Sequence, residues 1–153
     1  MSLPRWIFPG FREWLAKQKT TRHRRFQITN LTRETVIATN VEIADTGAKR
    51  NRGLLGRNDL AAGDGLWIVP CQSVHTFGMQ FSIDLIYLDS NHKIRKIRSS
   101  VSPWRVSICL SAQSVVELPA GTVCETQTRP GDFLEIKDAV TPGINGHGSA
   151  VLP

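Results

Sequence analysis

The sequence predicts a mainly β protein with a minor helical part: a compact antiparallel barrel-like or jelly-roll-like sandwich with one short helix near residues 46–57. Several short segments are rich in β-branched and aromatic residues, and turn residues separate them at short intervals. The chain has 153 residues, 12 of them glycine and 8 proline, and 41% are hydrophobic. This length allows one domain with a real core and is too short for two ordinary domains.

The first 25 residues are predicted to be a basic appendage with an amphipathic helix. Phe11, Trp14 and Leu15 fall on one helical face. Basic residues accompany them, since residues 1–33 contain eight Lys or Arg and a single acid. We expect this tail either to lie on an anionic membrane surface or to pack its aromatic side chains on its own domain or on a partner subunit.

The charge and the cysteines limit the function classes. Because the tail carries most of the net charge of +6, residues 34–153 sum to −1, and no specific nucleic-acid binding is expected. Three cysteines without C-x-x-C spacing argue against a disulfide framework or a zinc site and favour a reducing compartment. The N-terminus lacks the apolar core of a secretory signal, and no run of about 18 apolar residues occurs. We therefore expect a cytoplasmic protein, or one that is peripheral on the inner membrane face.

The folded domain is predicted to span residues 26–138, and residues 139–153 are predicted to be a loose tail. Alternating, β-branched residues at 26–31 and 35–44 indicate a hairpin. Shorter apolar segments bounded by turn residues predict the later strands. These strands are expected at residues 66–69, 92–98, 100–111, 113–118 and 133–137.

The short helix is predicted to follow the hairpin directly. Asp45 or Thr46 can cap its start, and the helix is expected to run to about Arg57. Gly53 and Gly56 cost helix stability, each by about 1 kcal/mol relative to alanine. We therefore expect the two glycines to serve close packing or helix termination.

The stretch from Ser73 to Asp89 contains the densest alternation of apolar residues in the chain. It is longer than a typical strand and contains Gly78, so we expect two strands joined at that glycine. His75 and Thr76 are predicted to stand beside this irregularity. Asp84 is predicted to lie within the second strand.

Asp84 and Glu117 are acids inside apolar segments, and a buried carboxylate needs hydrogen bonds or an ion-pair partner. Arg52 or Arg57 on the short helix can supply a bidentate guanidinium. These four residues form either a structural ion-pair network or the polar floor of a pocket. The first interpretation is favoured, since most buried ion pairs serve no chemistry.

His75 has two interpretations. Its imidazole titrates near neutral pH, which suits a general base or a ligand anchor, whereas the alternative is a side chain at the core edge that bonds to a backbone carbonyl. Cys71 lies four residues before it, but one thiol and one imidazole are too few for a metal site and too common to indicate a nucleophile. No metal site and no cofactor are predicted.

Several separated motifs resemble, in order, the family of domains of unknown function numbered 192, over roughly residues 36–137. The motifs are Arg52-Gly53-Leu54-Leu55-Gly56-Arg57, Gly65-Leu66-Trp67, His75-Thr76-Phe77-Gly78-Met79 with Phe81 and Ile83-Asp84, Val116-Glu117-Leu118-Pro119-Ala120-Gly121, and Gly131-Asp132. Two positions depart from the family pattern: Ser82 stands where members often have proline, and Leu55 where methionine is usual. The resemblance implies a small, mostly β, barrel-like or jelly-roll-like domain, and it implies no established activity.

The leading functional hypothesis is a binding module with a pocket for a small polar or anionic ligand, because polar residues interleaved with apolar ones are typical of ligand sites. The candidate ligand-binding residues are Arg52, His75, Thr76, Met79, Asp84 and Glu117. One alternative is a hydrolase- or lyase-type enzyme in which His75 is the base and Asp84 or Glu117 orients it. Another is a scaffold domain that the basic tail attaches to membranes.

Overall fold

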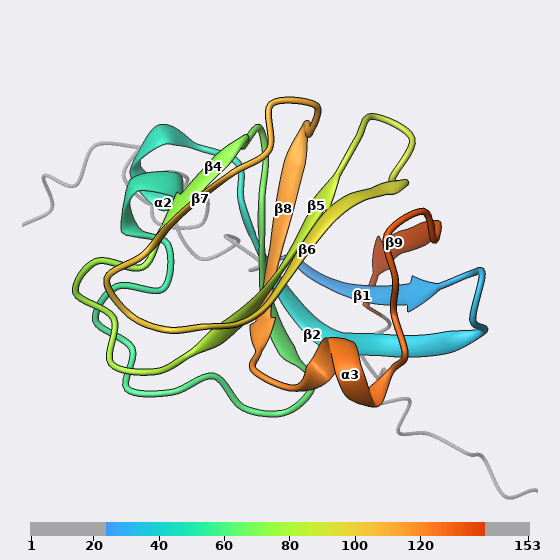
Figure 1. Cartoon of the computed structure of the whole chain (residues 1–153), viewed down its shortest axis with the longest axis horizontal. Helices are drawn as coiled ribbons and strands as arrows, with labels where there is room; N and C mark the ends of the chain where they lie inside the picture. Colours follow the sequence, from blue (N-terminus) through green and yellow to red (C-terminus); the bar gives the residue numbers. More distant parts are fainter. Residues whose placement is uncertain (1–23, 140–153) are drawn as a thin grey trace, which may run out of the picture.

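The structure, a computed structural model, describes residues 24–139, which form nine strands and two short helices (Figure 1). The strands are β1 (Arg25–Asn30), β2 (Thr35–Ala44), β3 (Asp64–Ile68), β4 (Ser73–His75), β5 (Ile83–Leu88), β6 (Ile94–Val101), β7 (Val106–Ile108), β8 (Ser114–Pro119) and β9 (Leu134–Asp138). The helices are α2 (Gly47–Arg52) and α3 (Thr122–Glu125).

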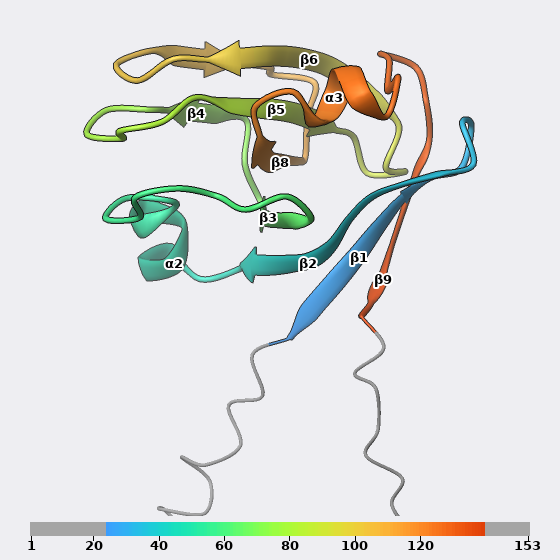
Figure 2. The same cartoon turned by 90° about the horizontal axis from the view of Figure 1, so that it is seen from below.

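Seven strands form one sheet in the order β6-β5-β8-β3-β2-β1-β9, and β4 pairs with β7 in a separate two-stranded sheet. The large sheet curls into a half-barrel, as seen in Figure 2. Its strand pairs are antiparallel except for β2 and β3, which run parallel. The predicted mainly β, barrel-like fold is therefore confirmed, with one parallel pair as the exception to the antiparallel arrangement.

The hydrophobic core lies on both faces of β5 and β8, whose residues are almost all buried. Successive side chains of a strand point to opposite faces. Ile86 and Val116 therefore belong to one hydrophobic cluster, and Leu85 and Val115 belong to another. Because both faces are covered, β5 is an almost continuous apolar segment that Asp84 alone interrupts.

Helix α2 is shorter than the predicted segment 46–57. Thr46 caps its start, where the side-chain oxygen accepts a hydrogen bond of 3.3 Å from the backbone nitrogen of Lys49. The helix ends at Arg52, where Gly53 follows with a φ of 49°, a positive value that glycine adopts at little cost. The expected terminating role of Gly53 is confirmed, and the expected continuation to Arg57 is wrong.

The stretch from Ser73 to Asp89 forms two strands, β4 and β5, with Gly78 in the connection, as predicted. The strand predicted at residues 100–111 is reduced to the three residues of β7. Strand β6 extends further than expected, to Val101, and a positive φ of 63° at Trp104 interrupts the extended backbone before β7.

The two-stranded sheet lies against one face of the half-barrel. The Tyr87 hydroxyl donates a hydrogen bond of 2.8 Å to the backbone oxygen of Ser107, and the Lys96 ammonium donates one of the same length to the backbone oxygen of Ile108. Tyr87 lies on β5 and Lys96 on the edge strand β6, so β7 is held over these two strands.

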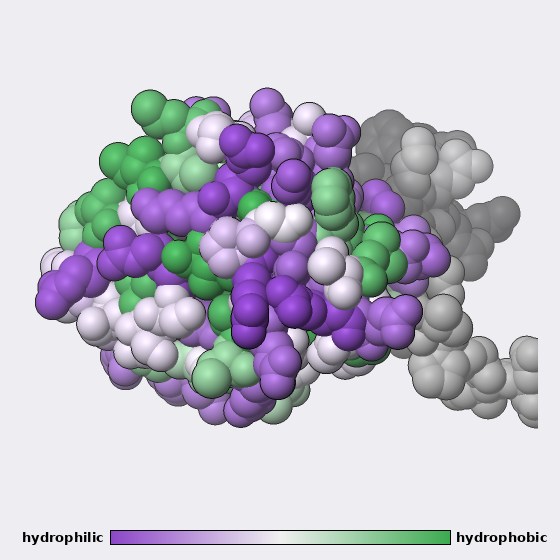
Figure 3. Space-filling model, turned by 45° about the vertical axis from the view of Figure 1, so that its right-hand side comes forward, coloured by the Kyte–Doolittle hydropathy of each residue, from purple (hydrophilic) through white to green (hydrophobic). Residues whose placement is uncertain are grey.

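The surface is mixed in character. Hydrophobic side chains gather at one end of the face drawn in Figure 3, and hydrophilic side chains lie beside them.

The predicted appendage, residues 1–25, and the predicted tail, residues 139–153, lie almost wholly outside the described residues. The expected amphipathic helix and its attachment to a membrane therefore stay predictions. In the range 24–139, no helix has the length and apolar character needed to cross a membrane.

Candidate functional site

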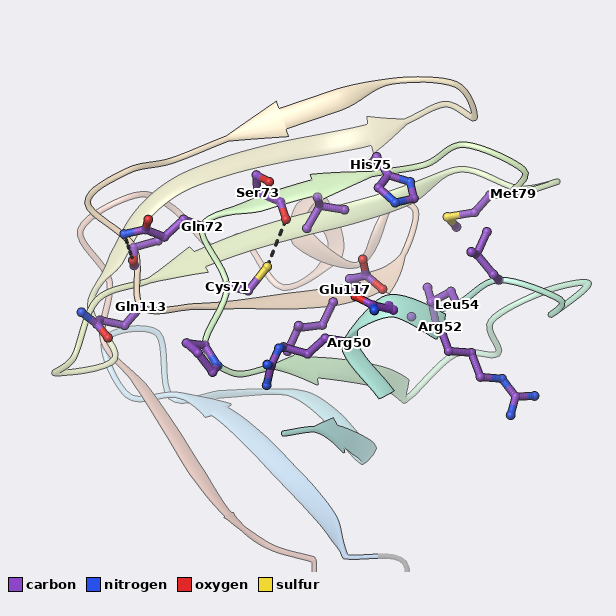
Figure 4. Close-up of a pocket in the computed structure, with 17 residues that line it drawn as sticks. Arg50, Arg52, Leu54, Cys71, Gln72, Ser73, His75, Met79, Gln113 and Glu117 are labelled. Carbon is purple, nitrogen blue, oxygen red and sulfur yellow. Dashed lines mark hydrogen bonds between the residues drawn. The ribbon is translucent and has the colours of Figure 1, made fainter. Parts of the chain in front are cut away.

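A pocket of about 480 Å³ lies between strand β4 and the segment of helix α2 with the turn that follows it (Figure 4). It is lined by residues 50–55, 70–75 and 112–113, together with Ile68, Met79 and Glu117. The structure thus brings four of the predicted site residues to one place, namely Arg52, His75, Met79 and Glu117. Thr76 and Asp84 do not line this pocket.

Glu117 is the most unusual residue of the pocket. It lies on β8 between Leu66 of β3 and Leu85 of β5, on the sheet face that carries the second hydrophobic cluster. Its side chain is buried, and its Oε2 atom has no hydrogen-bond partner among the described residues. Burial raises the pKa of this carboxyl to about 8, although the charge of Arg57 opposes the shift. Glu117 is therefore mostly protonated at neutral pH and can both donate and accept a hydrogen bond.

The arginines of helix α2 do not neutralise Glu117. Arg50 is held by two backbone carbonyls, since its Nη1 atom donates to Asp45 at 3.0 Å and to Val69 at 3.2 Å. Arg52 is exposed, and its guanidinium points away from Glu117 in Figure 4. Arg50 lines the pocket but was not predicted; its only sequence signal was its position on the predicted helix beside Arg52.

Arg57 has a different partner from the one predicted. Its Nη2 atom lies 3.0 Å from the Glu42 carboxylate, which also pairs with Arg25 at 2.7 Å. The predicted network of Arg52, Arg57, Asp84 and Glu117 is therefore not formed. Glu42 lies near the end of β2, beside the turn that follows α2, and no motif in the sequence indicates it as the partner of Arg57.

Asp84 has a structural role that differs from the predicted ion pair. Its side chain is fully buried, and its carboxylate accepts three backbone hydrogen bonds. The donors are Ser100 N at 2.7 Å, Gly121 N at 3.1 Å and Val123 N at 2.9 Å. A carboxylate satisfied in this way has no need of an arginine, and it is not available to orient His75.

His75 lies at the rim of the pocket with an exposed side chain, and its ring stacks on Phe77 with 5.2 Å between centroids. Within residues 24–139, no hydrogen bond or ion pair joins His75 to Glu117. Thr76 is buried on the other side of the strand, where its hydroxyl donates to the Ser102 carbonyl at 2.8 Å and accepts from Arg105 N at 2.9 Å. Thr76 therefore holds the chain in place between His75, the last residue of β4, and Phe77.

Cys71 lines the same pocket as His75. Its thiol donates to the Ser73 carbonyl at 3.1 Å, and burial raises its pKa. The thiol therefore stays protonated at neutral pH, which argues against a reactive thiolate. Among the described residues, no three His, Cys, Asp or Glu side chains gather closely enough to hold a metal ion.

The fold and the site can be compared with known proteins. The chain is 31% identical over 112 residues to a UPF0127 protein of Thermococcus sibiricus, which covers 69% of this chain and 71% of the relative. It is 33% identical over 101 residues to the UPF0127 protein PH1112 of Pyrococcus horikoshii, which covers 62% of this chain and 85% of the relative.

Two crystal structures have the same fold. R01717 of Sinorhizobium meliloti, provisionally named a transcription regulator, superposes with a TM-score of 0.65 at 24% identity, over 73% of this chain and 92% of that one. A protein of unknown function from Novosphingobium aromaticivorans superposes with a TM-score of 0.64 at 19% identity, over 72% and 83%. The family model DUF192, described as an uncharacterized ACR, matches residues 28–136. The resemblance seen in the motifs is thus confirmed, and the chain belongs to the DUF192 family.

Proposed function

We propose that this protein is a ligand-binding module, and that its pocket takes a small polar ligand that hydrogen-bonds to Glu117. The observation that carries the proposal is Glu117 itself, which lines the pocket and whose buried Oε2 atom has no hydrogen-bond partner among the described residues. A buried polar atom left unpaired costs about 1–3 kcal/mol. A ligand that supplies the missing hydrogen bond would recover this cost on binding.

The dimensions and lining of the pocket support the same proposal. Its volume of about 480 Å³ lies in the range of small-molecule sites, roughly 300–1,000 Å³. Leu54, Val74 and Met79 supply an apolar wall, and all three are buried. About half of the lining residues carry polar side chains, which suits a ligand that is fixed by several hydrogen bonds.

One end of the proposed ligand binds Glu117. The charges around the pocket favour a hydrogen-bond acceptor or an anionic group at the other end of the ligand. Arg50 and Arg52 both line the pocket, and its only acid, Glu117, is mostly neutral at pH 7. Arg50 is already positioned by the Asp45 and Val69 carbonyls, so little side-chain entropy is lost when it meets a ligand. The ligand would therefore carry a donor toward Glu117 and an acceptor toward Arg50.

A thermal-shift screen of polar metabolites with the full chain tests this proposal. Any ligand that stabilises wild type is then titrated against Glu117→Leu, which removes both oxygens from an already apolar environment and should remain folded. Glu125→Leu is the control, because Glu125 is exposed on α3 and away from the pocket. We expect the ligand to lose at least tenfold in affinity for Glu117→Leu and less than twofold for the control. Equal affinity for all three proteins would overturn the proposal.

A catalytic use of the pocket is the second candidate, and one observation favours it. The Glu117 carboxyl, whose pKa is raised to about 8, shares the pocket with the exposed imidazole of His75. Carboxyls with a raised pKa are common in active sites. If the pocket is catalytic, His75→Gln should abolish turnover of a ligand found in the screen while its affinity changes little. A ligand that wild type binds and leaves chemically intact over hours would exclude this alternative for that ligand.

A further inference from the structure

The surface of the two-stranded sheet carries an unusual group of exposed hydrophobic side chains, which we call the β7 strip. Its members and their exposed fractions are Phe77 (43%), Trp104 (65%), Val106 (53%), Ile108 (51%) and Leu110 (78%). They are five of the eight large hydrophobic side chains that are exposed among the described residues. The strip is thus a local concentration and not a scatter of single residues.

The strip is continuous because of the alternation of β7. Ser107 points inward, with its backbone carbonyl bound to Tyr87, so Val106 and Ile108 on either side of it point outward. Val106 pairs across the strands with His75, whose ring stacks on Phe77. The Phe77 ring in turn lies 5.8 Å from the ring of Trp104. These contacts join Val106, Phe77 and Trp104 through His75 at the rim of the pocket, and Ile108 lies beside Val106 on the same face of β7.

Basic residues border this strip and acids are absent from its sequence neighbourhood. Residues 90–116 contain five Lys or Arg and no Asp or Glu, and residues 71–83 contain no Asp, Glu, Lys or Arg. Lys96 binds the carbonyl of Ile108 directly, while Arg98 on β6 and Arg105 next to β7 are exposed. Although residues 34–153 as a whole are nearly neutral, the basic residues of this stretch thus outnumber its acids, and Lys96, Arg98 and Arg105 lie on or beside the strands that form or support the strip.

We propose that the protein docks on anionic lipid surfaces through the β7 strip. The strip combines an exposed tryptophan with aliphatic side chains and a positive border, which is the composition that interfacial membrane binding requires. This surface lies within the folded domain, and the proposal is independent of both the N-terminal tail and the ligand pocket.

The same observations disfavour other occupants. A second copy of the chain would bring two positive faces together, and the like charges would repel. Single-stranded nucleic acid is bound by aromatic side chains on which successive bases stack, whereas three of the five side chains of the strip, Val106, Ile108 and Leu110, are aliphatic. An acidic protein partner fits the charge, and it is separated from lipid by the experiment below.

Vesicle co-sedimentation of the full chain tests the proposal. The vesicles are phosphatidylcholine alone or phosphatidylcholine with about one third phosphatidylglycerol. We expect binding only to the anionic vesicles, and loss of binding as salt is raised from 50 to about 500 mM, because exposed charges are then screened. The double variant Ile108→Ser/Leu110→Ser and the double variant Arg98→Ser/Arg105→Ser should each partition at least tenfold less.

The matched control is Leu31→Ser/Val36→Ser, which removes two exposed aliphatic side chains from the β1–β2 hairpin, outside the strip. It should bind as wild type does, within a factor of two. Circular dichroism confirms that each variant is folded before it is compared. If wild type does not bind anionic vesicles, or if the strip variants bind as well as the control, the proposal is wrong. In the first case an acidic protein is the remaining occupant, and in the second the N-terminal tail makes the attachment.

Discussion

The Oδ2 atom of Asp84 lies 2.9 Å from the backbone nitrogen of Val123, although 39 positions separate the two residues in the sequence. The same oxygen accepts from Gly121 N, and the other oxygen accepts from Ser100 N. One buried side chain on β5 therefore fixes the C-terminal part of β6 and the start of α3. The carboxylate replaces backbone partners that these irregular segments cannot find in the sheet.

Asp84→Ala should be strongly destabilising. The substitution leaves three backbone donors without their acceptor, and a buried unsatisfied group costs about 1–3 kcal/mol. We expect the free energy of unfolding from urea denaturation to fall by about 3 kcal/mol or more, and by less in Asp84→Asn, which keeps one acceptor. Asp59→Asn is the control, since Asp59 is exposed, and it should change stability by less than about 0.5 kcal/mol. An Ala variant as stable as this control would show that Asp84 is not structural.

Asp84 also shows where inference from the sequence stops. The apolar context of the residue predicted its burial and its need for partners, and both were right. The partners were predicted to be arginines because a guanidinium is visible in a sequence, whereas backbone N–H groups are common to nearly every residue and carry no sequence signal. Only the path of the chain at the end of β6 and around α3 determines which of them point at Asp84.

The fold was predictable to a greater extent than the site, for a similar reason. Alternation and turn residues are local, so the hairpin of β1 and β2 and the break at Gly78 could be identified. The parallel pairing of β2 with β3 is non-local, and it depends on the direction of the chain after α2. For the pocket, Glu117 could be singled out as an acid among apolar residues, but no local pattern shows that Arg50 of α2 lines the same pocket.

Glu117 should make stability fall as pH rises through the neutral range. Its pKa is about 8 in the folded protein and 4.5 in an unfolded chain, so the folded state holds the proton more tightly between these values. By linkage, its contribution is fully present below about pH 4.5, declines by at most about 1.4 kcal/mol per pH unit, and is lost above about pH 8. Glu117→Gln should lack this decline. The check is urea denaturation of both proteins from pH 5 to pH 9; parallel stability curves would mean that Glu117 is ionised in the folded state.

Gly65 in β3 should not tolerate a side chain. A Cβ atom there would lie 3.1 Å from Leu118 Cδ2, 3.2 Å from the Glu117 carbonyl oxygen and 3.3 Å from Val41 Cγ2. Two of these three atoms belong to the central strand β8, which cannot move without disturbing the core on both of its faces. We expect Gly65→Ala to lower thermal stability by about 1–3 kcal/mol in unfolding free energy. Gly65→Ala should also lower the affinity of the pocket for any ligand that binds Glu117.

Gly47 provides the matched control for that substitution. It lies at the start of α2, and a Cβ atom there would meet no atom within 4 Å. Because alanine favours the helix over glycine by about 1 kcal/mol, Gly47→Ala should be neutral or slightly stabilising in the same thermal melt. Similar losses of stability in Gly65→Ala and Gly47→Ala would mean that close packing at β3 does not explain the loss in Gly65→Ala.

Asp132 should make the protein sensitive to acid. Burial alone would raise the pKa of its carboxyl, but hydrogen bonds from Asn30 at 3.0 Å and from Arg33 at 3.1 Å outweigh burial and lower the pKa below its usual 3.8. The stabilisation is therefore present above about pH 4 and is lost as pH falls through the lowered value.

Asp132→Asn should reduce the free energy of unfolding at pH 7 by about 1–3 kcal/mol and should flatten the loss of stability below pH 4. Acid titration of the two proteins, followed by circular dichroism, measures this difference directly. If the variant lost structure over the same pH range and as steeply as wild type, the acid response would have to arise from another carboxylate, and Glu42, paired with Arg25 and Arg57, would be the next to substitute.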